Sequence, residues 1–362
     1  MTKLNAKNER LKRDYFRFQK EARGKSIATI DAMRKAISRF EDYTGARDFK
    51  TFHREQAIGF KKKLAETEGL RTAEVLSSST QVSTLNVVKE FFIWLAWQPG
   101  FKSKIHLPDT EYFALSRKDN ATAKATKLRD FPSLEQVQAT IARMSIESVV
   151  ERRNRALIAF TILTGMRDSA IASLSLRHID LSKVPPLVRQ EPDRVKTKFS
   201  KSINTYFFPI GDDVAKIVAD WIIELRTVHL FSPNDPAFPR TKVSQGEDMC
   251  FRPDGIEPIH WANASPIRDV FKRAFEKADL PYFPPHSFRH TLGRLMQTAC
   301  RTPEQMKAWS QNLGHEGLGT TLMSYGKIDG HRQGEVIAGI SLHAAPEANK
   351  VLEMIRTLVQ VS

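Results

Sequence analysis

The second half of the chain carries side chains of the kinds that act on phosphate esters. Arg167 lies in "LTGMRDSA", and His286 and Arg289 share "HSFRH". His315 ends "LGH", and Tyr325 follows ten residues later in "SYGKIDG". A guanidinium can bind two phosphate oxygens, an imidazole can move a proton, and a phenol can act as a nucleophile. Each segment alone is weak evidence, and Tyr325 by itself is better interpreted as a packing residue.

A cluster of lysines is the next candidate. Lys196, Lys198 and Lys201 crowd a predicted β-turn in "VKTKFSKS". The default interpretation is that all three are solvated. The alternative is that one of them, on a flexible tip, reaches a phosphate oxygen or a leaving group.

Two histidines at helical spacing raise the question of a metal site. His286 and His290 are four residues apart, as in the zinc-protease motif. That motif needs a glutamate directly after the first histidine, and Ser287 stands there instead. No third ligand is evident nearby, so we expect no metal, and we interpret His290 as structural.

Taken in order, these motifs resemble the tyrosine recombinase (phage-type integrase) family. The resemblance rests on "TGMRDSAIASLSLRHID", "HSFRHTL" and "LGHEGLGTTLMSYG", and it extends over the whole chain. It implies that Arg167 is the first family arginine and that His286 and Arg289 are the His-x-x-Arg pair. It also places His315 at the family's His/Trp position and Tyr325 at the position of the nucleophile.

The resemblance implies DNA strand exchange without metal, ATP or another cofactor. Lys198 fits the family's hairpin lysine in "KFSKSINTYFFPI", while Lys196 and Lys201 remain alternatives. A free phenol has a pKa of about 10 and is a poor nucleophile at neutral pH, so the cut needs two arginines on the phosphate and a base on the tyrosine. The expected product is a 3′-phosphotyrosine and a free 5′-hydroxyl.

Three features depart from the family pattern. Ala170 stands where an acidic residue often follows the first arginine, so support for Arg167 must come from elsewhere. The spacing from His315 to Tyr325 is one residue longer than is common. Residues 228–262 contain several prolines and are expected to form an additional loop-rich region.

The patterns predict a mainly α protein with a small antiparallel sheet. Residues 1–105 are expected to form a helical, SAM-like core-binding domain and 106–130 a basic linker. Residues 131–345 are expected to form an α+β domain that breaks and rejoins DNA, and 346–362 a helical tail. We expect the two domains to close around DNA as a clamp.

Local patterns support these elements. Apolar residues at helical spacing precede a stop signal at Gly45: Ile27, Ile30, Met33, Ile37 and Phe40. Residues 185–213 place Val, Thr, Tyr and Phe among turn residues and predict a β-hairpin or small sheet. Apolar residues before Gly165 predict a buried helix that ends there.

The overall charge indicates a polyanionic partner. The net charge is +15, and the basic residues are spread along the chain rather than gathered in one amphipathic helix. Nucleic acid is therefore favoured over a membrane surface. Cys250 and Cys300 match no paired spacing. No stretch approaches the roughly 18 apolar residues of a membrane span. We expect a cytoplasmic, nucleoid-associated protein.

The expected partners are double-stranded DNA and further copies of the chain, as a tetramer on DNA, with accessory DNA-bending proteins. We favour integration or excision of a mobile element. The alternatives are Xer-like chromosome resolution, relaxation like that of a type IB topoisomerase, and a DNA-binding relic without catalysis.

Overall fold

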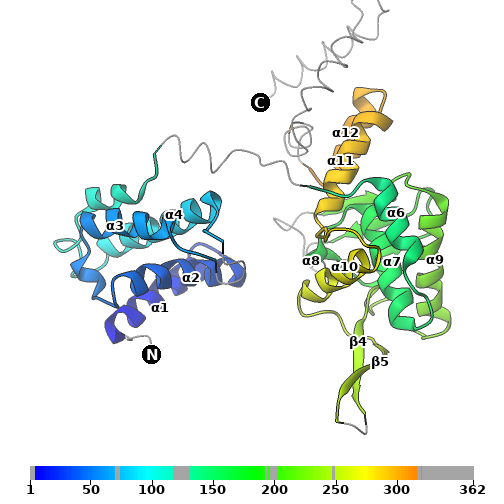
Figure 1. Ribbon diagram of the computed structural model, residues 1–362, viewed down its shortest axis with the longest axis horizontal. Helices are drawn as coiled ribbons and strands as arrows, with labels where there is room; N and C mark the ends of the chain where they lie inside the picture. Colours follow the sequence, from blue (N-terminus) through cyan, green and yellow to red (C-terminus); the bar gives the residue numbers. More distant parts are fainter. Residues whose placement is uncertain are drawn as a thin grey trace, which may run out of the picture. The chain divides into compact units, whose positions relative to one another are not determined.

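The computed structural model describes residues 5–69, 74–116, 130–191, 195, 202–246, 249–315 and 319. The chain divides into two compact units, Met1–Lys127 and Leu128–Ser362. Both are built mainly from helices, with small antiparallel sheets in the second, as the sequence predicts (Figure 1). The closing of two domains as a clamp stays a prediction. None of the described helices is long and apolar enough to cross a bilayer.

The first unit is a helical bundle, and its helices follow the predicted patterns. Its elements are α1 (Ala6–Glu21), α2 (Ile27–Tyr43), η1 (Phe49–Thr51), α3 (Arg54–Ala65), α4 (Ser78–Ala96) and η2 (Leu107–Phe113). In α2 the predicted stripe buries Ile30, Ile37 and Phe40, whereas Ile27 is 71% exposed. Ile27 is the first helical residue and lies beyond the packed face.

Aromatic rings fill the core of this unit. Phe52 stacks on Phe92 with ring centroids 4.0 Å apart and on Phe113 at 5.4 Å. Phe113 belongs to η2 and is 1% exposed. The linker predicted to begin at residue 106 therefore begins later, since η2 packs into the helical unit. Phe113 was assigned to the linker because residues 106–130 as a whole are polar and rich in lysine and arginine.

The second unit is built around one central helix. Its helical elements are α6 (Leu134–Arg143), α7 (Val149–Thr164), α8 (Asp168–Ile171), η3 (Leu176–His178), α9 (Asp212–Thr227), α10 (Ser265–Lys277), α11 (Ser287–Ala299) and α12 (Pro303–Asn312). Every residue of α7 from Ala156 to Thr164 is buried, so this helix is enclosed on all sides. Figure 1 shows α7 among α6, α9 and α10. The helix ends at Gly165, as predicted.

The predicted hairpin is part of a three-stranded antiparallel sheet. Its strands are β1 (Ile179–Asp180), β2 (Leu187–Gln190) and β3 (Ile203–Tyr206), in the order β1-β2-β3. Gln190 pairs with Ile203, so the segment that joins β2 to β3 leaves and re-enters the sheet at these two residues. Lys196, Lys198 and Lys201 belong to that segment and lie outside the described residues.

The region predicted to be loop-rich contains an antiparallel ribbon. Its strands β4 (Arg240–Gln245) and β5 (Phe251–Glu257) pair with a bulge between Thr241 and Val243. Most of their side chains are exposed, so the sequence shows no alternation of apolar and polar residues. Pro253 lies within β5 and also argued against a strand. The prediction of loops was wrong here for both reasons.

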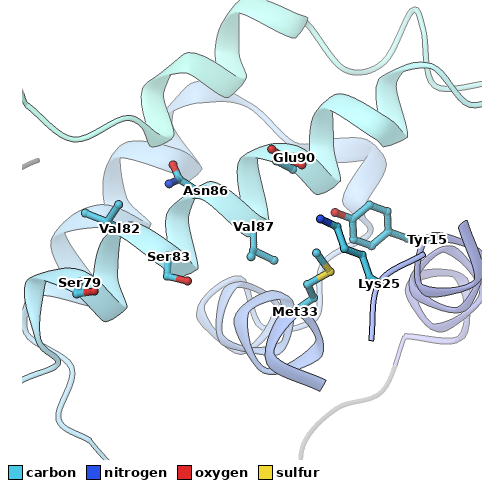
Figure 2. A pocket seen from close by; sticks show the side chains of 9 residues that line it. All are labelled: Tyr15, Lys25, Met33, Ser79, Val82, Ser83, Asn86, Val87 and Glu90. Carbon is cyan, nitrogen blue, oxygen red and sulfur yellow. The ribbon is translucent and has the colours of Figure 1, made fainter. Parts of the chain in front are cut away.

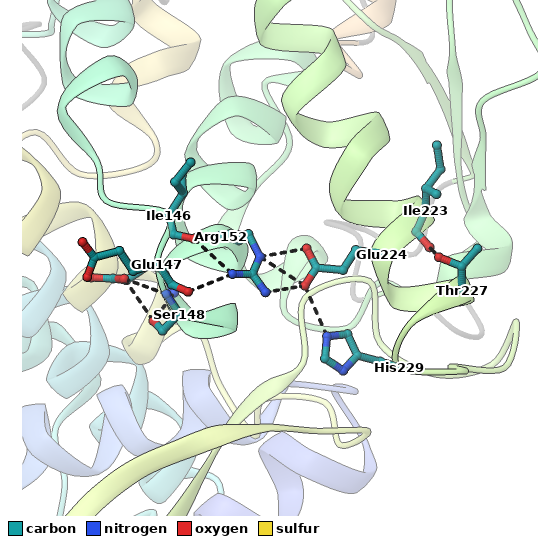
Figure 3. A network of polar contacts seen from close by, with 9 residues as sticks. Ile146, Glu147, Ser148, Arg152, Ile223, Glu224, Thr227 and His229 are labelled. Atoms are coloured by element: carbon teal, nitrogen blue, oxygen red, sulfur yellow. Dashed lines mark hydrogen bonds and ion pairs between the residues drawn. The ribbon is translucent and has the colours of Figure 1, made fainter.

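An ion-pair network joins the start of α7 to α9 (Figure 3). The Arg152 guanidinium donates to both carboxylate oxygens of Glu224, with an Nη2–Oε1 distance of 2.8 Å. Its other end donates to the carbonyls of Ile146 and Glu147, and His229 contacts the same carboxylate. Burial opposes ionisation of Glu224, but these hydrogen bonds outweigh it and lower its pKa below the usual value.

Replacing Glu224 with glutamine is expected to lower the free energy of unfolding by about 1–2 kcal/mol at pH 7, because charge-assisted bonds become neutral ones. The folded-state pKa is lowered, so this stabilisation is present above the unfolded pKa and is lost as pH falls through the folded pKa. Urea unfolding at pH 7 measures the difference in the free energy of unfolding between the wild type and Glu224→Gln. At about pH 4 the same measurement should give a smaller difference. Asp220→Asn is the control, because the Lys216–Asp220 pair on the same helix is exposed. A larger loss in the control would contradict the assignment.

Candidate active site

Gly165 and Arg167 form the first wall of the site. Gly165 has φ +58°, and a Cβ there would lie 2.7 Å from Leu313 Cδ2 and 2.8 Å from Leu292 Cδ1. Only glycine therefore fits both the left-handed turn and the close approach of α11 and α12. Arg167 follows as the N-cap of α8 and is half-buried. Asp168 Oδ2 accepts a hydrogen bond from Arg268 Nε on α10 and lies 2.8 Å from Arg268 Nη2, and this ion pair fixes the segment after Arg167.

His286 and Arg289 lie at the start of α11. Pro284 and Pro285 lead into the helix, and the Ser287 hydroxyl donates to the Pro284 carbonyl at 2.6 Å. Phe288 is fully buried in the core, and this anchor fixes the rotation of α11 and so the positions of His286 and Arg289. His290 stacks on Phe131 with ring centroids 6.0 Å apart, in keeping with the structural role expected for it.

The Arg289 guanidinium is the centre of the site. It is 3% exposed, and it donates to the carbonyl of Gly165 and to that of Leu313, both at 2.6 Å. Its Nη2 also lies 2.7 Å from His315 Nε2. These three partners are neutral, and both carbonyls follow helix ends, where the helix dipole favours a cation. The ends of α7 and α12 are thus joined through one buried cation.

Both histidines of the site are neutral at pH 7. Burial, then the charge of Arg289, lowers the pKa of His286 to about 4, and Arg167 adds to the shift. Burial, then the charges of Arg289 and Arg167, lowers the pKa of His315 to about 4. A guanidinium can only donate, so His315 Nε2 accepts and its proton is on Nδ1. The charges of Arg167 and Arg289 act on both His286 and His315, so these four predicted residues lie close together.

Arg167 and Arg289 also line one small pocket, together with polar groups on other elements. Gln190 and Ile203, the two ends of the β2–β3 connection, belong to the same lining. Lys198, Lys196 and Lys201 therefore lie on a segment whose two ends are at this pocket. Tyr325 lies outside the described residues, so the structure does not place it.

Sequence reasoning missed three polar residues at this pocket. Gln190 donates to Thr205 Oγ1 at 2.9 Å, and that hydroxyl donates to the Asn312 carbonyl at 3.2 Å. These residues lie on β2, β3 and α12. The sequence carries no signal that could have joined them, because Thr205 and Asn312 are 107 residues apart in the chain and no pattern of the sequence links the two segments.

The first unit holds a pocket of a different character (Figure 2). Tyr15, Lys25, Met33 and Glu90 contribute to it, and Figure 2 shows Lys25 beside Tyr15. Its other lining residues are serines, Asn86 and two valines. The pocket therefore mixes both charges with apolar groups and resembles no phosphate site. We place the candidate chemistry in the second unit.

Comparisons with known proteins agree with this placement. XerH recombinase bound to palindromic difH substrate, in a post-cleavage complex, shares the fold with TM-score 0.59 and 18% identity, covering 88% of this chain and 82% of that one. A lambda integrase (75–356) dimer bound to a COC′ core site has TM-score 0.59 and 11% identity, covering 89% of this chain and 96% of that one. Tn1549 transposon integrase in complex with transposon right end DNA has TM-score 0.58 and 14% identity, covering 91% of this chain and 98% of that one.

Identities this low establish the fold alone. No curated protein matches the chain by sequence. The family model described as "Phage integrase family", however, matches residues 133–331, which is more than half of the chain. Its match includes all the motifs from Arg167 to Tyr325. The chain therefore belongs to the phage integrase family of tyrosine recombinases.

Proposed function

We propose that this protein is a site-specific DNA recombinase that cuts and rejoins DNA through a 3′-phosphotyrosine, acting on a mobile genetic element. One observation carries the proposal. Arg167 and Arg289 line one pocket, and the two neutral imidazoles of His286 and His315 lie within electrostatic reach of both. Two guanidiniums at one small pocket, of which that of Arg289 is held by two carbonyls, suit a phosphodiester, and they can stabilise its transition state without a metal.

The arginines bind the non-bridging phosphate oxygens. Arg289 is held by two carbonyls before any substrate arrives, so its direction is set in advance. Bound phosphate offsets the charges of Arg167 and Arg289, which raises the pKa of the neighbouring imidazoles towards the ordinary value. His315 then donates a hydrogen bond to a phosphate oxygen.

The proton transfers follow from the protonation states. Tyr325 Oη forms a bond to phosphorus as the bond from phosphorus to the 5′-oxygen breaks. Neutral His286 accepts the phenolic proton, and Lys198, as an ammonium, gives a proton to the departing 5′-oxygen. The phosphotyrosine retains the energy of the cut phosphodiester. A 5′-hydroxyl from another strand can therefore reverse the step and join new partners.

The DNA and the assembly are part of the proposal. The solved relatives were captured on a difH substrate, a COC′ core site and a transposon end. This supports double-stranded DNA as the substrate, and the net charge of +15 agrees with it. We propose a tetramer on DNA, since exchange between two duplexes needs four cuts, with DNA-bending proteins as accessory factors and the nucleoid as the location.

One experiment tests the function and separates its rivals. The protein is incubated in EDTA with duplexes of random sequence that carry scattered nicks, so that released ends diffuse away. We expect SDS-resistant adducts whose attached DNA converges on one site, and joined products from two duplexes that carry the site. Relaxation of a supercoiled plasmid without joining would favour a topoisomerase. Binding without any adduct would favour a catalytically silent relic.

A further inference from the structure

The outer edge of β3 exposes one backbone step. Tyr206 is the last residue of β3 and lies opposite Leu187 on β2. The next amide, that of Phe207, donates to Pro186 at 2.9 Å, on the β2 side. Because successive residues of a strand alternate their hydrogen-bonding direction, the N–H and C=O of Tyr206 point away from β2.

The side chain of Asn312 binds that step. Asn312 Oδ1 accepts from the Tyr206 N–H at 2.7 Å, and Asn312 Nδ2 donates to the Tyr206 carbonyl at 2.8 Å. The carboxamide carries the same donor and acceptor as a peptide group, so it replaces one step of a neighbouring strand. Gly314 also lies against β3, since a Cβ there would be 2.9 Å from Ile203 Cδ1. The end of α12 is thus docked along β3.

The two sides of this contact belong to different parts of the site. Asn312 is followed by Leu313, whose carbonyl accepts from Arg289, and by His315. Ile203, at the other end of β3, follows directly on the segment that carries the three lysines. Asn312 therefore connects β3, the strand that follows the lysine-bearing segment, to the turn that holds the Arg289 guanidinium and the His315 imidazole.

We propose that Asn312 is a positioning residue that fixes β3, and with it the end of the strand where the lysine-bearing segment joins, against the turn that holds Arg289 and His315. The inference rests on the proposed function, because it takes the hairpin lysine as the donor of the proton to the leaving oxygen. Only an amide serves. An aspartate of the same shape accepts from the Tyr206 N–H but repels the Tyr206 carbonyl, and alanine loses both bonds.

The test uses two substrates that differ at the scissile bond. In one the leaving atom is the normal 5′-oxygen, and in the other it is a 5′-bridging sulfur, which leaves as a thiolate without being protonated. Asn312→Ala and Asn312→Asp are expected to slow single-turnover cleavage of the oxygen substrate by about 10- to 100-fold. On the sulfur substrate both variants should cleave within a few-fold of the wild-type rate, and Lys198→Ala should show the same pattern.

The matched control is Gln311→Ala, which removes an exposed amide one residue earlier on the same helix. It should leave both rates unchanged. Equal slowing of Asn312→Ala on both substrates would overturn the proposal, because the defect would then lie in the phosphate clamp or the fold. Unchanged rates on both substrates would also overturn it. The wild-type adduct reports on the proposed function itself, whereas the ratio between the substrates reports on Asn312.

Discussion

Tyr325→Phe is expected to abolish the covalent protein–DNA adduct while leaving DNA affinity within about two-fold of the wild type. The variant loses the one oxygen that would attack phosphorus, and phenylalanine has no atom that can replace it. Affinity depends mainly on contacts between basic side chains and phosphates elsewhere, which the substitution leaves in place. A denaturing gel with a nicked duplex of the selected site measures the adduct, and a mobility-shift assay at fixed salt measures the affinity.

The control is Tyr112→Phe, which removes a hydroxyl from a side chain that is 40% exposed in the first unit. It should form the adduct at the wild-type level. If the Tyr325 variant still forms an adduct, another residue is the nucleophile. The ten-residue separation from His315 could reach up to about 35 Å when extended, so the expectation for Tyr325 comes from its motif and not from distance.

Local signals in the sequence predicted elements well where one residue controls a boundary. Gly165, the predicted end of the buried helix, ends α7 with a positive φ. The spacing of His286 and Arg289 places them one turn apart at the start of α11. Such signals act within a few residues and survive any tertiary arrangement.

Contacts between distant segments could not be predicted in the same way. Arg289 and the Gly165 carbonyl are 124 residues apart, and Asn312 and Tyr206 are 106 apart. Every residue has a backbone carbonyl, so the sequence does not indicate which carbonyls Arg289 binds, and its buried partners were not predictable. The grouping of Arg167 and His315 with the α11 pair was expected only from the family resemblance.

The β4–β5 ribbon was missed for a further physical reason. A two-stranded ribbon with both faces exposed buries little, so nothing requires alternating apolar residues. Its base is held by Arg153, which donates to the Pro239 carbonyl at 2.8 Å and to Thr241 Oγ1 at 2.9 Å. The elements that form the site were predictable because they bury an apolar face, which the ribbon does not.

Arg289→Lys is expected to lower the single-turnover cleavage rate by about 100- to 1000-fold, the usual effect of losing one donor to a developing charge. Lysine keeps the charge but loses the planar fork, so it cannot hold the Gly165 and Leu313 carbonyls and a phosphate at the same time. Leaving one of these buried carbonyls without a donor should also lower the free energy of unfolding by about 1–3 kcal/mol. Rapid-quench cleavage and thermal unfolding measure the two effects separately.

DNA binding discriminates a clamp from a simple phosphate contact. The affinity of Arg289→Lys should fall by less than about ten-fold, since one charge is conserved and most phosphate contacts lie elsewhere. Arg294→Lys, at an exposed position on the same helix, should change neither cleavage nor affinity and so controls for the helix itself. Equal losses in binding and cleavage would remove the clamp role, because a group that acts only in the transition state must affect the rate more than the affinity. If the cleavage rates of further α11 variants fall in proportion to their melting temperatures, Arg289 acts on cleavage only through the stability of the fold.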